Sequence, residues 1–261
     1  MFPLKDNIPT RRFPVVTLVL VVTCTVVWFV FEASLWNISE TGNERVIEYG
    51  AIPYEITHPG DYCGVDATGT QIVCEGQEGV TGNAPEQATW WVTVFTSMFM
   101  HGSFLHLAGN MLFLWIFGNN IEDSMGRGRF VAFYALGGMA ALGGQVLVDP
   151  DSAVPTVGAS GAIAAVLGGY ALLYPRARVI TLVFIIIFFT VIELPALLVL
   201  GLWFLLQLAY GVNDIAQPVD AGGGVAYFAH LGGFVFGLLA IKLFANHVHE
   251  DYDSERRIPV Y

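Results

Sequence analysis

Long apolar stretches without a charge alternate with polar connections along this chain of 261 residues. Several of them reach or exceed about 18 residues, the length at which a helix spans the hydrocarbon core of a bilayer. The pattern predicts an all-α polytopic membrane protein with six transmembrane helices. The predicted spans are Phe13–Phe31, Phe104–Asn119, Phe130–Val148, Val157–Tyr174, Leu194–Val212 and Val225–Phe244.

Two further apolar stretches have the wrong length for a span. Ala88–Met100 runs into the second span across "HGS", and the uncharged stretch that contains both has 34 residues, too many for one crossing and too few for two. We therefore expect Ala88–Met100 to lie at the membrane interface and Ser103 to cap the helix that follows. Val179–Ile192 has only 14 residues and is predicted to be a re-entrant or interfacial segment before the fifth span.

The basic residues set the direction of the spans. With six spans and a cytoplasmic N-terminus, ten of the eleven Lys and Arg residues lie on the cytoplasmic side, and Arg45 is the exception. A seventh span would move the C-terminal basic residues outside. The first span is expected to be retained, because its apolar run is too long for a signal peptide. The predicted organisation is a cytoplasmic N-terminal tail over 1–12, a membrane domain over 13–245 with an acidic outer loop over 34–103, and a cytoplasmic C-terminal tail over 246–261.

Composition agrees with a membrane protein. Charged residues make up 13% of the chain, against about a quarter in soluble domains. The net charge of −11 disfavours binding to nucleic acid, and an acidic chain with few lysines suits high ionic strength, as in a salt-loving organism. Because the topology places Cys63 and Cys74 outside, we expect them to form a disulfide, whereas Cys24 is expected to be an inert packing residue.

In this topology the second, fourth and sixth spans run inward, so four polar residues lie just below the outer surface: His106, Asn110, Ser160 and His230. His106 and Asn110 share a helix face at i, i+4. Small residues repeat every four positions along the fourth and sixth spans, which lets two backbones approach closely. These stripes are Gly161, Ala165 and Gly169, and Ala229, Gly233 and Gly237. If they face each other, Ser160 and His230 come within hydrogen-bond reach.

Ser160 and His230 have the chemistry of a nucleophile and its general base. His106, Asn110 and the backbone N–H of Ser160 are candidate donors to an oxyanion. A dyad is expected, because the spans offer no carboxylate to orient His230. Two alternatives remain: a serine that serves only packing, and a zinc site of His101, His106 and His230. No carboxylate or thiol at this depth joins the histidines, so no metal and no cofactor is expected.

From about Thr89 to Phe244 the chain resembles the rhomboid intramembrane serine proteases. Four motifs of that family occur in order: "HxxxxHxxxN" as His101, His106 and Asn110; "GxxxExxxG" as Gly118, Glu122 and Gly126; "GxSG" as Gly158, Ala159, Ser160 and Gly161; and "AHxxG" as Ala229, His230 and Gly233. Two family features differ. Val92 and Thr93 replace a Trp-Arg pair in the outer loop, and Ala164 replaces an aromatic residue that packs on the catalytic histidine.

The resemblance implies a six-helix rhomboid bundle and a serine endopeptidase that cuts single-span or polytopic membrane proteins in or near their transmembrane segments. It implies a Ser160/His230 dyad acting through an acyl-enzyme, an oxyanion site with His106 and Asn110, and supporting roles for His101, Gly158 and Gly161. It also implies a cavity that opens to the outer face of a prokaryotic cell membrane, entered between spans two and five. A catalytically silent relative that binds membrane clients and a small-solute transporter are the alternative functions.

Overall fold

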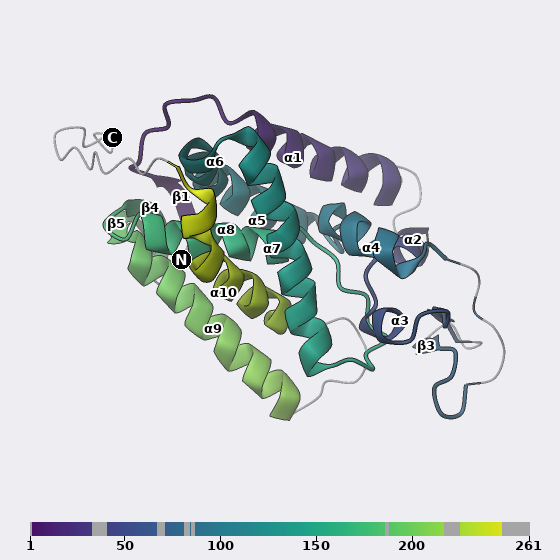
Figure 1. Ribbon diagram of the computed structural model, residues 1–261. Coiled ribbons are helices and arrows are strands. Elements are labelled where there is room, and N and C mark those ends of the chain that lie inside the picture. The colour runs from purple at the N-terminus through teal and green to yellow at the C-terminus, as the bar shows by residue number, and fades with distance from the viewer. Residues whose placement is uncertain are drawn as a thin grey trace.

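The computed structural model describes residues 2–32, 41–66, 71–80, 84, 87–185, 188–216 and 225–246. Within these residues the protein is mostly helical, with a bundle of helices and a small β-structure at each end of it (Figure 1). Among the described residues, four helical segments are long and apolar enough to cross a membrane: Val15–Glu32, Arg127–Val148, Ala196–Ala216 and Tyr227–Phe244.

The helices of the bundle follow the six predicted apolar spans. The first continues from an α-helix into a π-helical segment. The second is divided into three consecutive helical pieces, the middle one a π-helical turn, and runs on beyond its predicted end at Asn119. The elements are α1 (Val15–Val26) with η1 (Val27–Glu32), α5 (Phe104–Phe113), η3 (Leu114–Gly118), α6 (Asn119–Met125), α7 (Arg127–Val148), α8 (Ser160–Leu173), α9 (Ala196–Ala216) and α10 (Tyr227–Phe244).

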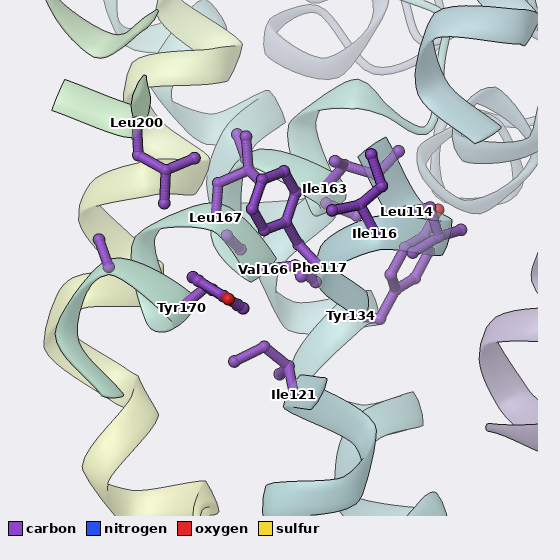
Figure 2. Packing of buried hydrophobic residues seen from close by; sticks show 14 of the residues in the cluster. Leu114, Ile116, Phe117, Ile121, Tyr134, Ile163, Val166, Leu167, Tyr170 and Leu200 are labelled. Carbon is purple, nitrogen blue, oxygen red and sulfur yellow. The ribbon is translucent and has the colours of Figure 1, made fainter. Parts of the chain in front are cut away.

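Helix α8 is the centre of the bundle, and every residue from Gly161 to Ala171 is buried. Its apolar side chains pack with rings and branched side chains from neighbouring helices, among them Phe117 and Leu200 (Figure 2). Between apolar helices in a membrane such contacts stabilise through close packing more than through removal of surface from water. The small residues of α8 are what make this packing possible.

The two stripes of small residues face each other, which was the condition for Ser160 and His230 to meet. A Cβ added at Gly233 of α10 would lie 2.2 Å from the carbonyl oxygen of Gly161, and one added at Gly237 would lie 2.0 Å from that of Ala165. No side chain fits at these distances. The backbones of α8 and α10 are therefore in direct contact over about two turns of α8, from Gly161 to Gly169, starting beside Ser160.

The class all-α is wrong for the segment before α9. The predicted re-entrant or interfacial stretch is a β-hairpin of β4 (Arg178–Ile185) and β5 (Phe188–Pro195), and β1 (Phe2–Asp6) completes a sheet of order β1-β4-β5. The stretch is rich in β-branched and aromatic residues, which favour strands. As a hairpin it pairs backbone polar groups of β4 and β5 with each other, and β1 covers the other edge of β4.

Buried polar contacts fasten this end of the bundle. The carboxylate of Asp6 accepts hydrogen bonds from Asn120 Nδ2 at 2.5 Å and from the Tyr170 hydroxyl at 2.6 Å. Desolvation raises the pKa of Asp6 to about 7. Glu122 accepts from the backbone N–H of Val16 at 3.0 Å and of Thr17 at 2.8 Å, so it satisfies donors at the start of α1. The predicted N-terminal tail thus contributes a strand to the fold.

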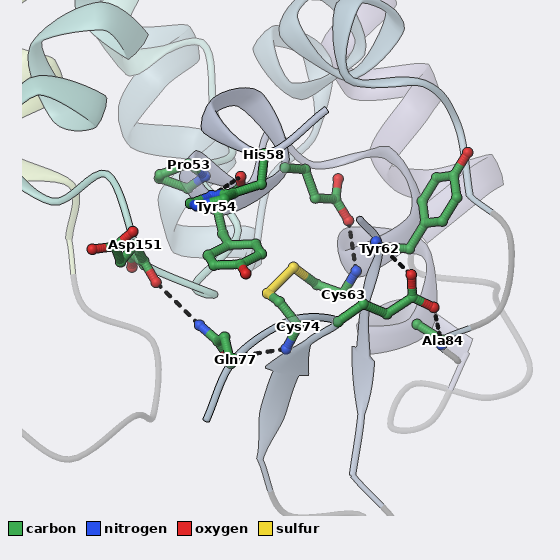
Figure 3. The surroundings of a disulfide bond; sticks show 12 residues. Pro53, Tyr54, His58, Tyr62, Cys63, Cys74, Gln77, Ala84 and Asp151 are labelled. Atoms are coloured by element: carbon green, nitrogen blue, oxygen red, sulfur yellow. Dashed lines mark hydrogen bonds between the residues drawn. A yellow bond between two sulfur atoms is a disulfide. The ribbon is translucent and has the colours of Figure 1, made fainter. Parts of the chain in front are cut away.

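The opposite end carries the segment between α1 and α5. It contains α2 (Thr41–Tyr49), α3 (Pro53–Thr57), the hairpin of β2 (Cys63–Val65) and β3 (Ile72–Cys74), α4 (Trp90–Thr96) and the short η2 (Ser97–Phe99). A disulfide joins Cys63 and Cys74 across the hairpin, as predicted from the sequence (Figure 3). The stretch expected at the interface forms α4 and η2, with Trp90 and Trp91 exposed.

The segment from α3 to the turn after β3, here called the hairpin segment, contacts the loop between α7 and α8. Gln77 Nε2 donates to the carbonyl oxygen of Asp151 at 3.3 Å (Figure 3), and the backbone N–H of Tyr54 donates to that of Ser152 at 3.1 Å. The same loop leads into Ser160. The disulfide-bonded hairpin segment is therefore part of the framework around the first turn of α8.

Candidate active site

Ser160 is the first residue of α8, and the residues before it are held on both sides. Thr156 exchanges two backbone hydrogen bonds with Ala51, at 2.8 and 3.2 Å. Gly158 has φ +124 and donates its N–H to the carbonyl oxygen of Ser97 at 2.8 Å. A Cβ at Gly158 would lie 2.8 Å from His106 Nε2, so both its backbone conformation and its surroundings require glycine.

His230 lies in the first turns of α10 and faces Ser160. Its Nε2 is 2.8 Å from Ser160 Oγ, within hydrogen-bond distance. The contact follows from the packing of the two stripes, because Gly161 and Ala229 are the sequence neighbours of these two residues. The residue is 9% exposed. A buried imidazole beside a serine hydroxyl is the arrangement that proton transfer from that hydroxyl requires.

Two residues of α9 complete the surroundings of the imidazole, and sequence reasoning missed both. Gln207 Oε1 lies 2.7 Å from His230 Nδ1, and the ring of Trp203 lies with its centroid 5.8 Å from that of His230. Trp203 provides the aromatic contact that Ala164 does not. The available signal was an amide inside an otherwise apolar span, four residues after a tryptophan, which places both on one helix face.

His106 and Asn110 lie on α5 near the same place. Ser103 Oγ accepts from the backbone N–H of His106 at 3.2 Å, which confirms the predicted helix cap. The side chain of Asn110 is buried, and its Nδ2 has no hydrogen-bond partner within the described part of the chain. Ser160 itself offers a further donor, because the first backbone N–H groups of a helix have no intrahelical acceptor.

His101 precedes α5 and supports His106. The two rings meet edge to face with centroids 5.2 Å apart, and burial lowers the pKa of His101 to about 4. The backbone N–H of His101 donates to Glu32 Oε2 at 2.8 Å. This carboxylate at the end of η1 therefore binds the backbone of His101, whereas the contact to His230 Nδ1 comes from Gln207.

A cavity of about 1200 Å³ joins these residues to the disulfide-bonded hairpin. His106, Asn110, Ser160 and His230 line it at one end, and hairpin residues such as Ile72 line the other. In the part of the chain that the structure covers, no group of three or more His, Cys, Asp or Glu side chains is placed to hold a metal ion. The lining of the cavity thus brings together the predicted nucleophile Ser160, the predicted base His230 and the predicted oxyanion donors.

The sequence was compared with known proteins. A family model described as a rhomboid domain matches residues 87–247. "Rhomboid protein 1, mitochondrial" of Saccharomyces cerevisiae is 32% identical over 154 residues, which cover 57% of this chain and 40% of that protein. "Presenilin-associated rhomboid-like protein A, mitochondrial" of Danio rerio is 31% identical over 157 residues, 59% and 38% of the two chains. "Rhomboid protease GluP" of Bacillus subtilis is 40% identical over 88 residues, 34% and 16%. The matches thus span at most two fifths of these relatives.

Proposed function

Because the chain belongs to the rhomboid family, whose model covers more than half of it, we propose that it is an intramembrane serine endopeptidase. Its substrates are membrane proteins, single-span or polytopic, cut in or near a transmembrane segment. The observation that carries the proposal is the 2.8 Å contact between His230 Nε2 and Ser160 Oγ at the wall of a large cavity. The family name alone does not supply that contact.

The reaction proceeds in two halves. Ser160 Oγ attacks the peptide carbonyl carbon while His230 Nε2 takes the hydroxyl proton, and a tetrahedral intermediate forms. The C–N bond then breaks, the imidazolium returns the proton to the leaving amine, and an acyl-enzyme remains. Water attacks the ester in the second half with His230 again as base, and the release of the new carboxyl group restores Ser160.

Three donors are proposed to stabilise the oxyanion: Asn110, His106 and the backbone N–H of Ser160. Asn110 Nδ2 supports this role most directly, because it is a buried donor without a partner among the described residues. A buried unpaired donor is costly, and the negative oxygen of the intermediate would satisfy it. Such preorganised donors contribute roughly 3–4 kcal/mol each to transition-state stabilisation.

We also propose the arrangement in the membrane that the charge distribution predicts. Six spans cross a prokaryotic cell membrane, with both termini and the β1-β4-β5 sheet on the cytoplasmic side and the cavity open to the outer face. A substrate helix enters between α5 and α9, the helices of spans two and five. A reporter fused after Tyr261 is expected to be cytoplasmic, and an external reporter would contradict both this topology and the mechanism.

The test of the function is cleavage by the purified protein. A panel of single-span proteins is incubated with it in detergent or liposomes, and the products are mapped by mass. Ser160→Ala and His230→Ala should each abolish cleavage, and the double variant should be no worse, because the pair acts as one unit. Ser152→Ala is the matched control, since Ser152 also lines the cavity, and within the described residues its hydroxyl oxygen accepts from the backbone N–H of Val154 rather than contacting a histidine.

Labelling with a fluorophosphonate separates the proposal from its two rivals. A protease is labelled at Ser160, whereas a silent relative that only binds membrane clients and a small-solute transporter are not. Wild-type protein that cuts none of the panel and carries no label at Ser160 would remove the protease proposal. Cleavage by Ser160→Ala at the wild-type rate would show that this serine is only a packing residue.

A further inference from the structure

We infer that Gln207 is a positioning residue of the proposed catalytic dyad: its side-chain oxygen holds His230 in the tautomer and orientation that the reaction needs. The inference rests on the proposed function and extends it to a third residue, on a third helix. The carrying observation is the 2.7 Å distance between Gln207 Oε1 and His230 Nδ1, on the ring edge remote from Ser160.

The direction of this hydrogen bond decides the tautomer. An amide oxygen only accepts, so Nδ1 must carry the proton and donate it to Gln207. In a neutral imidazole Nε2 then has the free lone pair, and it is Nε2 that lies 2.8 Å from Ser160 Oγ. The opposite tautomer would present an N–H to the serine and could not accept its proton. Gln207 therefore selects the form of His230 that acts as a base.

Gln207 is a polar residue among exposed apolar neighbours on α9. It lies on α9, an apolar helix with few buried residues, and its neighbours Leu206 and Leu208 are exposed at 43% and 40%. A polar side chain on such a helix is costly in a membrane unless it finds a partner. Gln207 does not line the cavity, whereas His230 does, so we assign it an effect on the reaction through His230.

Trp203, one turn earlier on α9, contacts the face of the same imidazole. Helix α9 therefore supplies both the acceptor that sets the protonation of the ring and the aromatic surface that limits its rotation. The start of α9 is fixed beside the sheet by the hydrogen bond from the Ala196 N–H to the carbonyl oxygen of Ala177, the residue before β4, at 2.7 Å. Gln207 lies beyond the midpoint of the helix, so it reaches His230 only while that part of α9 rests on α10.

The experiment compares Gln207→Leu, Gln207→Glu and the control Leu205→Ala, which alters a side chain 60% exposed on the same helix. Gln207→Leu should lower kcat roughly 10- to 100-fold, the effect of losing one hydrogen bond at a charge-forming group, with KM unchanged. The rate of fluorophosphonate labelling at Ser160 should fall by a similar factor. These rates are taken per mole of folded protein, judged by thermal unfolding.

Gln207→Glu keeps an acceptor for Nδ1–H but adds a negative charge that stabilises the imidazolium. It should retain activity and move the acid limb of the pH–activity profile upward by roughly one pH unit or more. His106, the other titratable side chain that lines the cavity among the described residues, is unchanged in both variants. A purely structural role for Gln207 would leave this limb where it is.

The inference is overturned if Gln207→Leu labels and cleaves like Leu205→Ala, or if the profile of Gln207→Glu matches the wild type. A poorly folded Gln207→Leu leaves the decision to Gln207→Glu. Failure of the proposed function looks different, because the wild-type protein itself would then show no label at Ser160.

Discussion

A methyl group added at Gly233 tests whether the approach of α10 to α8 sets the activity. The new Cβ would lie 2.2 Å from the carbonyl oxygen of Gly161, whereas real Cβ contacts are not shorter than 3.0 Å. Because α8 is buried along its length, the two helices must part by about 0.8 Å or more, the difference between these distances. The 2.8 Å between His230 Nε2 and Ser160 Oγ then becomes about 3.6 Å, beyond hydrogen-bond range.

We therefore expect Gly233→Ala to lower the cleavage rate roughly 100-fold, the cost of a misplacement of about 1 Å, although both reacting residues are intact. Gly143→Ala on α7 is the matched control, because a Cβ there meets no atom within 4 Å. Both variants are assayed in detergent against one transmembrane substrate, with folded protein quantified by size-exclusion chromatography. Equal rates for the two variants would refute the reasoning and show that the dyad tolerates looser packing.

Asn110→Ala should leave measurable cleavage with kcat lowered roughly 100- to 1,000-fold, because one oxyanion donor is lost and the nucleophile is not. Asp6→Asn should change the pH dependence of stability: with a pKa of about 7 in the folded state against 3.8 as the ordinary value, Asp6 stabilises fully below about pH 4 and loses this contribution as the pH rises through 7. Unfolding temperatures of Asp6→Asn in detergent should therefore fall less than those of the wild type over that range. Replacing Cys63 and Cys74 with serine should cost the hairpin about 2–3 kcal/mol of stability, seen as faster proteolysis there, while cleavage at saturating substrate persists because neither cysteine lines the cavity.

The features predicted correctly from the sequence depend on short-range patterns. The length of an apolar stretch, the spacing of small residues and the cap at Ser103 each depend only on residues that are close together in the sequence. The contact between Ser160 and His230 could be predicted on one condition, that the two small-residue stripes face each other, because the topology places both residues at a similar depth. Gln207 could not be assigned, because nothing in the fifth span fixes its rotation against α10, and a polar residue in a span indicates only that some partner exists.

The β-hairpin before α9 was missed for a related reason. Its 14 apolar residues fit an interfacial segment as well as two paired strands, and periodicity does not separate the two. What favours the strands is pairing with β1, and the partner residues Phe2 and Leu182 lie 180 positions apart. No local sequence pattern predicts the pairing of two strands over that separation.

That long-range pairing imposes an order on the synthesis of the protein. Ribosomes add roughly 5 to 20 residues per second, so β1 waits on the order of 10 to 35 seconds after it is made before β4 follows. In the proposed topology, the spans up to α8 enter the membrane during this interval without help from the sheet. The sheet closes just before α9 is made, and it fixes the end from which α9 starts. Loss of β1 should therefore disturb the insertion of α9, the helix that carries Gln207 and Trp203, and spare that of α1.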